Sequence, residues 1–223
     1  MEQTVVEVVP ISHATLVLKW GDTTIYVDPT GGGEMFAGQP PADIILVTDM
    51  HGDHFSTITL EAIAGSSRLI VPQVVKEGLP ASLVLQTTVQ GNDQIIREKD
   101  IQILAVPMYN LPDAQNKDFH VKGRGNGYVL EKDGFRVYIA GDTAGTPEMR
   151  ALSDIDIAFV PMNLPYTMGV EEAADAVLDF APRKVYPYHY RGPEGLSDVT
   201  AFKALVHAKN QNIDVVLADW YAR

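Results

Sequence analysis

The chain has 223 residues, a formal net charge of −12 and no cysteine. This length suits one sizeable hydrophobic core, and no linker-like stretch divides the sequence, so we expect a single domain over residues 1–223. The absence of cysteine excludes disulfides and thiolate ligands, so any metal must be held by His, Asp, Glu or Asn. The acidic balance argues against nucleic acid as a partner, because release of counterions requires a basic protein surface.

No apolar run is long enough to predict a membrane span. The first ten residues, MEQTVVEVVP, lack the basic and apolar regions of a secretory signal. That favours a cytoplasmic location, and a periplasmic location fits only if a signal peptide has been removed. The composition is ordinary for a soluble globular protein and leaves the oligomeric state open, a homo-oligomer included.

Short apolar runs rich in β-branched residues predict the strands of the first half. In chain order they span residues 5–9, 14–19, 23–27, 44–48, 68–71 and 101–106. Between them, Ser56 is the expected N-cap of a helix that runs through LEAIA, and Gly65 is its expected end.

The second half repeats this plan, with strands predicted at residues 126–131, 135–140, 155–160 and 183–188. Helices are expected to open at Thr146-Pro147, Thr167 and Ser197. In each half, strand pairs come first and helices later. This order predicts an α/β (α+β) fold of mixed sheets covered by helices, with two sheets packed face to face and the helices outside.

Four of the predicted strands end in side chains that can bind metal. These side chains are Asp49, His51, Asp53 and His54 after IILVT, Asn110 after ILAVP, Asp142 after VYIAG and His189 after VYPY. Ligand sites of such sheets gather beyond the strand ends, so we expect these residues to meet at one edge. Any one of them alone is more often structural than a ligand, and it is their convergence that favours a metal site.

The segment VTDMHGDHF has donors for two neighbouring ions. Asp49 and His51, one residue apart in extended chain, project to the same side. The turn at Gly52 directs Asp53 and His54 toward a second position. Asp142, with two carboxylate oxygens, is the natural bridge between the two ions.

We expect different locations for two histidines outside this set. His207, in the helical run FKALVHAKN, is expected at the surface. For His13, in ISHAT, two interpretations stay open. It is either a histidine at the edge of the core bonded to a backbone carbonyl, or a residue with a role near the site.

DMHGDH resembles the HxHxDH signature of the metallo-β-lactamase superfamily, with Asp142 in GDT and His189 in YPYHY matching its bridging Asp and last His. Within this superfamily, the chain resembles the branch of sugar-phosphate lactonases and N-acyl-phosphatidylethanolamine phospholipase D-like proteins. The segments that carry this resemblance are ISHATLVLKWGDTTIYVDP, AVPMYN, HVKGRGNGYVLE and PMNLPYTM. The resemblance implies a four-layer αββα sandwich and a hydrolase with one or two divalent ions (Zn, Mn or Fe) and a metal-bound hydroxide as nucleophile. It also implies that Asp53, Asp142 and His189 are catalytic.

The sequence departs from that signature at two positions. Asp49 stands where the signature has its first His, and Asn110 stands where a later His usually binds the first metal. The implied first site is Asp49, His51, Asn110 and Asp142, and the second site keeps Asp53, His54, Asp142 and His189. Oxygen donors are harder than imidazole, so the first site should be weak or should favour Mn, Fe, Mg or Ca over Zn.

Asp28, which closes TTIYVDP, matches the acidic residue that lies behind the histidines in this superfamily. There it would accept the ring N–H of a ligand histidine and fix its tautomer. The alternative is that an Asp before Pro only favours a turn.

The segment FHVKGRGNGY has the one basic cluster flanked by glycines. We expect His120, Lys122 and Arg124 to contact an anionic substrate, and a solvated loop is the alternative. Asn163 and Tyr166, from PMNLPYTM, are the further expected substrate contacts. The expected substrate is a small phosphate- or carboxylate-bearing ester, lactone or phosphodiester.

The chain has no cysteine and no GxSxG elbow, so covalent acyl-enzyme chemistry is disfavoured. Hydrolysis with metal-activated water is therefore the leading interpretation. An iron-dependent redox protein is a first alternative, disfavoured because no flavodoxin-like segment is present. A metal-stabilised binding protein without turnover is a second alternative.

Overall fold

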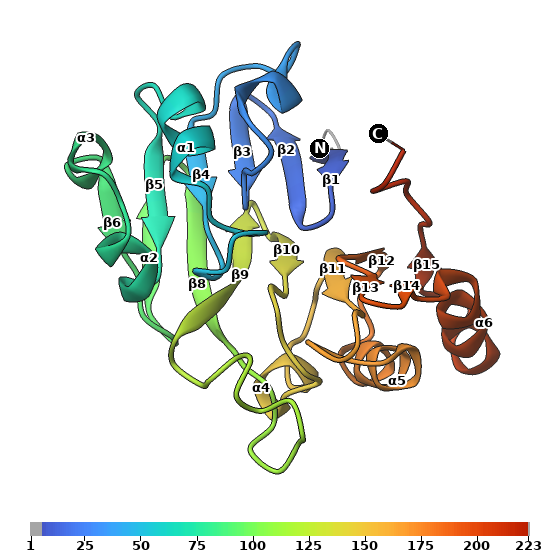
Figure 1. Ribbon diagram of the computed structural model, residues 1–223. Coiled ribbons are helices and arrows are strands. Elements are labelled where there is room, and N and C mark those ends of the chain that lie inside the picture. Colours follow the sequence, from blue (N-terminus) through green and yellow to red (C-terminus); the bar gives the residue numbers. More distant parts are fainter. Residues whose placement is uncertain (1–5, 223) are drawn as a thin grey trace. The chain divides into compact units, whose positions relative to one another are not determined.

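The computed structural model describes residues 6–222, which form two compact units (Figure 1). Unit 1 contains residues 6–91 and 220–222, and unit 2 contains residues 92–219. Each unit is built on one mixed sheet. None of the helices in the described part of the chain has the length and apolar character needed to cross a membrane.

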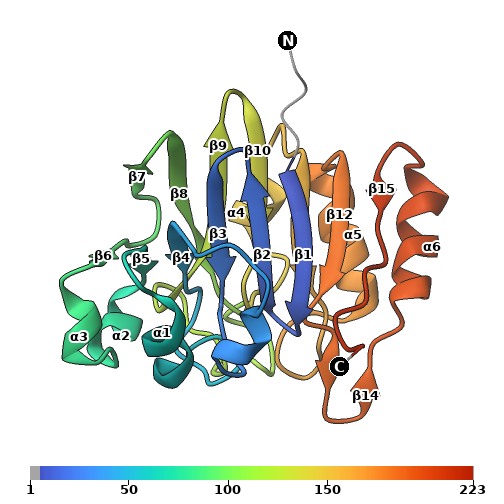
Figure 2. The same ribbon diagram turned by 90° about the horizontal axis from the view of Figure 1, so that it is seen from above.

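The sheet of unit 1 has six strands that lie side by side (Figure 2). Their order is β1 (Val6–Ser12), β2 (Thr15–Trp20), β3 (Thr23–Val27), β4 (Ile44–Leu46), β5 (Arg68–Val71) and β6 (Thr87–Val89). The first three strands are antiparallel, and β3 to β6 are parallel. The carboxyl ends of β3 and β4 therefore lie at the same edge, which brings Asp28 close to the segment 49–54.

Short helices cover unit 1: η1 (Gly33–Phe36), α1 (Thr57–Ile63), α2 (Gln73–Glu77) and α3 (Ala81–Val84). Leu60 of α1 and Val75 of α2 belong to one apolar cluster with Ile45 and Leu69 of the sheet. Strand β4 and residues 69–71 of β5 are buried apolar runs, as expected of parallel strands that are covered on both faces.

The sheet of unit 2 has seven strands. Their order is β15 (Asp214–Val215), β12 (Lys184–Tyr188), β11 (Ile157–Pro161), β10 (Phe135–Ile139), β9 (Gly125–Lys132), β8 (Ile101–Met108) and β7 (Ile95–Glu98). Strands β10, β11, β12 and β15 are parallel, and β8 has the same direction because β9 is antiparallel to both β8 and β10. Asn110, Asp142 and His189 therefore all follow strands that end at the same edge.

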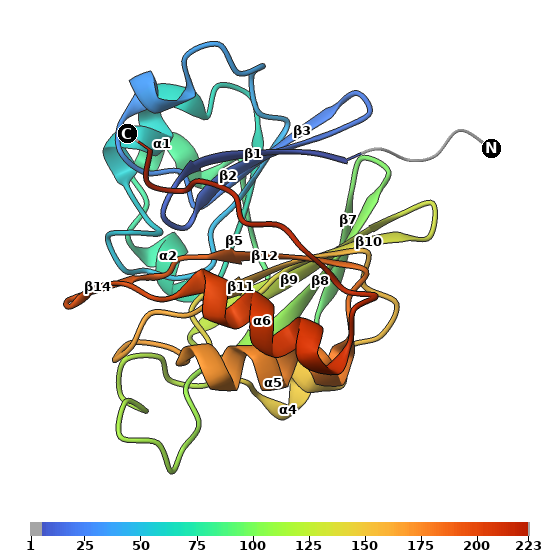
Figure 3. The ribbon, with the colours of Figure 1, turned by 90° about the vertical axis from the view of Figure 1, so that its right-hand side faces the viewer.

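Helices α4 (Pro147–Arg150), α5 (Val170–Phe180) and α6 (Val199–Lys209) lie along one face of this sheet (Figure 3). On α5, Phe180 is buried and its ring meets Tyr138 of β10 edge-on, with ring centroids 5.9 Å apart. A short hairpin, β13 (Arg191–Gly192) and β14 (Gly195–Leu196), follows His189.

The predicted fold class is confirmed, with two mixed sheets flanked by helices. All ten predicted strands are present, although Val5 lies outside the described residues. The sequence analysis missed the polar strand β6, the half-exposed β7, the two-residue strands β13, β14 and β15, and the short helices α2 and α3. The prediction of one domain over residues 1–223 stays a prediction.

Two predicted helix starts are confirmed and two are wrong. Ser56 accepts a hydrogen bond from the backbone N–H of Thr59, and Thr146 caps α4 in the same way. Helix α5 begins at Val170 instead of near Thr167, because the Thr167 hydroxyl is bonded to Asn163. The cap of α6 is the carboxylate of Asp198 and not Ser197.

Replacing Ser56 by Ala removes the cap of the helix that directly follows the segment 49–54. The free energy of unfolding should fall by about 1 kcal/mol, because the N–H of Thr59 loses its acceptor. Urea unfolding of the two proteins measures this difference. The matched control is Ser66→Ala, at an exposed position after the same helix, and an equal loss in both variants would contradict the assigned cap.

Candidate metal centre

The segment 49–54 of unit 1 forms a tight loop after β4. The backbone N–H groups of His54 and Phe55 both donate to the carbonyl of His51, at 3.0 and 2.8 Å. The Nδ1 of His51 lies 2.7 Å from the Oδ2 of Asp49, so these two side chains meet as the alternation predicted. Asp49 and His54 are buried, and Asp53 keeps 44% of its side chain exposed.

Asp28 ends β3 and lies, fully buried, behind this loop. Its Oδ1 accepts from the backbone N–H of Thr48 at 2.7 Å, and its Oδ2 accepts from the Thr48 hydroxyl at 2.6 Å. The same Oδ2 is 2.8 Å from Nδ1 of His54. Burial raises the pKa of Asp28, while the His54 imidazole and the Thr48 donors act in the opposite direction.

The contact with His54 agrees with the role that the family resemblance implied for Asp28, which was to accept the ring N–H of a histidine. An ionised carboxylate only accepts hydrogen bonds, so Nδ1 of His54 carries the proton. The other ring nitrogen, Nε2, is then left with its lone pair, which is the arrangement of a histidine prepared for a metal.

His13 lies in the two-residue turn between β1 and β2, with φ at 52°. Its Nε2 is 3.3 Å from Oδ2 of Asp53, and its Nδ1 is 2.7 Å from the hydroxyl of Tyr221. These contacts support the second of the two interpretations of His13, a role near the site.

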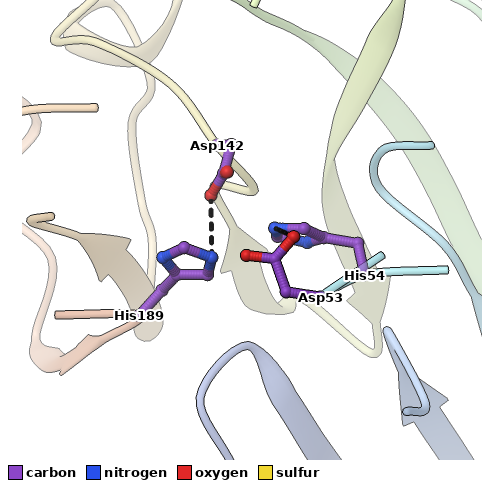
Figure 4. A group of neighbouring side chains, drawn as sticks. All are labelled: Asp53, His54, Asp142 and His189. Atoms are coloured by element: carbon purple, nitrogen blue, oxygen red, sulfur yellow. Dashed lines mark ion pairs between the residues drawn. The ribbon is translucent and has the colours of Figure 1, made fainter. Parts of the chain in front are cut away.

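In unit 2, the carboxylate of Asp142 lies between two imidazoles. Its Oδ1 is 3.3 Å from Nε2 of His189, and its Oδ2 is 3.1 Å from Nε2 of His120. All three side chains are buried. Figure 4 draws the pair of Asp142 and His189, and shows Asp53 and His54 of unit 1. Each oxygen of Asp142 thus faces a separate nitrogen donor.

The structure differs from the sequence analysis most clearly at His120. It was predicted to contact an anionic substrate as part of a basic cluster, with a solvated loop as the alternative, but only 2% of it is exposed. Its Nδ1 donates to the carbonyl of Tyr166 at 3.1 Å, which leaves Nε2 directed at Asp142. A buried imidazole held from behind in this way has the environment of a ligand and not of a solvated cation.

Asn110 shares the same carbonyl. Its amide nitrogen donates to the carbonyls of Tyr166 and Asn116, at 2.7 and 2.8 Å. Its Oδ1 is buried and has no hydrogen-bond partner among the described residues. An unpaired buried acceptor costs about 1–3 kcal/mol, so this oxygen is suited to a cation or a substrate donor.

The other predicted substrate contacts have partners within unit 2. The ammonium of Lys122 is 2.5 Å from Glu148, whose hydrogen bond raises the pKa of Lys122, and it lies over the ring of Tyr109. Arg124 is partly buried and donates to the carbonyl of Phe119 at 2.6 Å. Asn163 is hydrogen-bonded to Thr167, and the ring of Tyr166 meets Phe119 edge-on.

The donor chemistry fits a divalent cation. His54 and His120 each present Nε2 and are held through Nδ1 by an acceptor, the carboxylate of Asp28 and the carbonyl of Tyr166. The remaining donors are carboxylates and imidazoles, the ligands that Zn, Mn and Fe share. His and Asp side chains that could bind a metal ion are therefore present in both units.

Comparison with known proteins identifies the family. Residues 7–189 match the model of the Beta-lactamase superfamily domain. A UPF0173 metal-dependent hydrolase of Thermococcus onnurineus is 32% identical over 212 residues, which cover 91% of this chain and 93% of the relative. One of Thermus thermophilus is 33% identical over 198 residues, covering 83% and 84%.

A solved structure from Parabacteroides distasonis has the same fold. It matches with a TM-score of 0.83 and 34% identity, over 98% of this chain and all of that one. Its agreement in fold and the matches in sequence extend over nearly the whole length of the chain. The chain therefore belongs to the UPF0173 metal-dependent hydrolase family of the β-lactamase superfamily and has the metallo-β-lactamase fold, as the DMHGDH motif indicated.

Proposed function

We propose that the protein is a metal-dependent hydrolase that cleaves an ester, lactone or phosphodiester of a small anionic substrate. The observation that supports this most directly is Asp142, whose two carboxylate oxygens each face an imidazole Nε2. Membership of a family whose relatives are named metal-dependent hydrolases supports the same reaction class.

The proposed ligands are assigned from the superfamily pattern, from which they depart at Asp49 and at His120. In unit 1, Asp53 and His54 are assigned to the second site and Asp49 and His51 to the first. In unit 2, Asp142 and His189 are assigned to the second site and His120 to the first, with Asp142 as the proposed bridge. His120 takes the place that the sequence analysis gave to Asn110, and Asn110 contributes at most its amide oxygen. One or two divalent ions, of Zn, Mn or Fe, bind these donors. When bound, such an ion activates water and polarises the scissile bond.

The chain's own residues orient that chemistry. Asp28 fixes the ring of His54, and the carbonyl of Tyr166 fixes the ring of His120. Asp53 is the solvent-accessible carboxylate of the set, so we assign it the role of accepting a proton from the attacking water at a carboxylate oxygen.

Substrate charge is assigned to Arg124. The charge of Lys122 is already matched by Glu148, and Asn163 is bonded within its own loop. Arg124 has a planar guanidinium with five N–H donors, and such a group suits a carboxylate or phosphate.

The metal requirement is the first test. Protein purified without added metal should contain one or two equivalents of a transition metal by mass spectrometry. A chelator should abolish hydrolysis in an esterase and phosphodiesterase screen, and added metal should restore it. Loss of a residue that only supports a metal ligand typically weakens metal binding by about 10–100-fold. His54→Ala and His189→Ala should each weaken it by at least this much.

His207→Ala is the matched control for these variants. His207 lies on α6, and among the described residues its imidazole is hydrogen-bonded to the backbone carbonyl of Ile213. Full metal content in both ligand variants would overturn the assignment. Metal binding with no hydrolysis of any substrate class would favour the binding-protein alternative instead.

Asp49 should set metal preference. The carboxylate is a harder donor than the imidazole of the usual signature, so Asp49→His should shift the ratio of Mn²⁺ to Zn²⁺ affinity toward Zn²⁺. Competition binding of the two ions measures this ratio. An unchanged ratio in a folded variant would show that Asp49 is not a ligand.

Arg124→Ala should reduce kcat/KM for an anionic substrate far more than for a neutral analogue of the same leaving group. A charge-assisted hydrogen bond is worth about 1.5–3 kcal/mol, which corresponds to roughly 10–150-fold. Arg97→Ala, which removes an exposed arginine of β7 in the same unit, is the matched control. Equal losses on both substrates would mean that Arg124 only orders its loop.

A further inference from the structure

We propose that His13 is a positioning residue for Asp53 and that Tyr221, near the C-terminus, fixes His13 in that role. Trp220 and Tyr221 then support the metal centre. This inference rests on the proposed function, because Asp53 is one of the proposed ligands.

The contacts that carry the inference all lie within unit 1. Nε2 of His13 is 3.3 Å from Oδ2 of Asp53, while Nδ1 is 2.7 Å from the Tyr221 hydroxyl. The backbone N–H of His13 also donates to the carbonyl of Trp220 at 3.3 Å. Trp220 is buried, so the segment that contains Tyr221 is anchored beside the β1–β2 turn.

The hydrogen-bond network assigns the tautomer of His13. The carboxylate of Asp53 can only accept, so Nε2 of His13 must carry the proton. In a neutral imidazole the other nitrogen, Nδ1, is then an acceptor, and the hydroxyl of Tyr221 is its donor. Tyr221 therefore directs the N–H of His13 toward Asp53 from the far side of the ring.

Asp53 is the most exposed of the proposed ligands. Asp49, His54, Asp142 and His189 are buried, whereas the side chain of Asp53 is 44% exposed and that of His51 is 40% exposed. A donor on Oδ2 restricts the carboxylate to one orientation and leaves Oδ1, which lies 4.0 Å from Nε2 of His54, for the ion. Restricting a ligand in advance reduces the entropy lost on binding.

The β1–β2 turn supports a second part of the centre. The hydroxyl of Thr15, two residues after His13, donates to the backbone carbonyl of Asp28 at 2.6 Å. The hairpin of β1 and β2 therefore contacts Asp53 through the side chain of His13 and the backbone of Asp28 through Thr15.

The test separates the side-chain role from a backbone role. His13 has a φ of 52°, a left-handed conformation that Asn adopts more readily than Gln. A Gln side chain, in contrast, places its N–H group near the position of the histidine Nε2, which Asn cannot reach. If His13 positions Asp53, His13→Gln should be the better substitute; if only the backbone matters, His13→Asn should be.

The readouts are the apparent Kd for Mn²⁺, by competition with a chelating indicator, and the Tm of the metal-free protein. We expect His13→Asn to weaken Mn²⁺ binding by about tenfold and His13→Gln to retain most of the affinity. Tyr221→Phe should weaken binding several-fold with little change in Tm. Tyr26→Phe, which removes a hydroxyl bonded to the Pro40 carbonyl in the same unit, is the matched control and should leave affinity unchanged.

The outcomes distinguish a failure of the proposed function from a failure of the positioning role of His13. If the wild-type protein binds no Mn²⁺, Zn²⁺ or Fe²⁺, the proposed function fails. If the wild-type protein binds metal and His13→Asn and Tyr221→Phe bind it equally well, only the positioning role is overturned. A lower Tm in these variants with unchanged metal affinity would likewise show that the contact serves folding alone.

Discussion

The buried carboxylate of Asp28 accepts three hydrogen bonds, and these bonds organise the loop that has most of the donors in unit 1. Its partners are the backbone and hydroxyl of Thr48 and the ring of His54, so one side chain connects the end of β3 with the loop after β4. Removing one partner of a buried charge is costly, about 3–5 kcal/mol for an ion pair, because the other is left uncompensated. The conformation of the loop and the orientation of His54 are consequently fixed together.

In unit 2, the group that orients the imidazole is a neutral acceptor. The carbonyl of Tyr166 receives hydrogen bonds from both His120 and Asn110. A carboxylate behind an imidazole raises its basicity as a ligand, and a carbonyl orients the ring without adding charge. His54 is therefore expected to be a stronger donor than His120. This difference adds to the distinction between the two proposed sites, which the sequence analysis based on the departures from His at residues 49 and 110.

The strands and the residues that follow them could be predicted from the sequence, because both depend on local patterns of apolar and polar residues. The role of Asp28 as an acceptor behind a histidine was implied by the family resemblance, and its partner, His54, was identified only by the structure. The burial of His120 was not, because it depends on how the loop after β8 folds onto Tyr166. The contact of His13 with Tyr221 joins residues 208 positions apart, and no local pattern indicates it.

Three residues of the centre have left-handed backbones without being glycine: His13, Asp28 and His189, with φ of 52°, 45° and 47°. Such conformations cost of order 1–3 kcal/mol and are least unfavourable for Asn, Asp and His. Attempts to redesign the centre by exchanging ligands are therefore constrained by backbone shape as well as by chemistry. A β-branched residue at these positions would destabilise the turn itself, whereas residues 49 and 51, whose φ is not positive, are open to a wider choice of side chains. Laboratory evolution of a new metal specificity should therefore find tolerated substitutions most readily in the loop after β4.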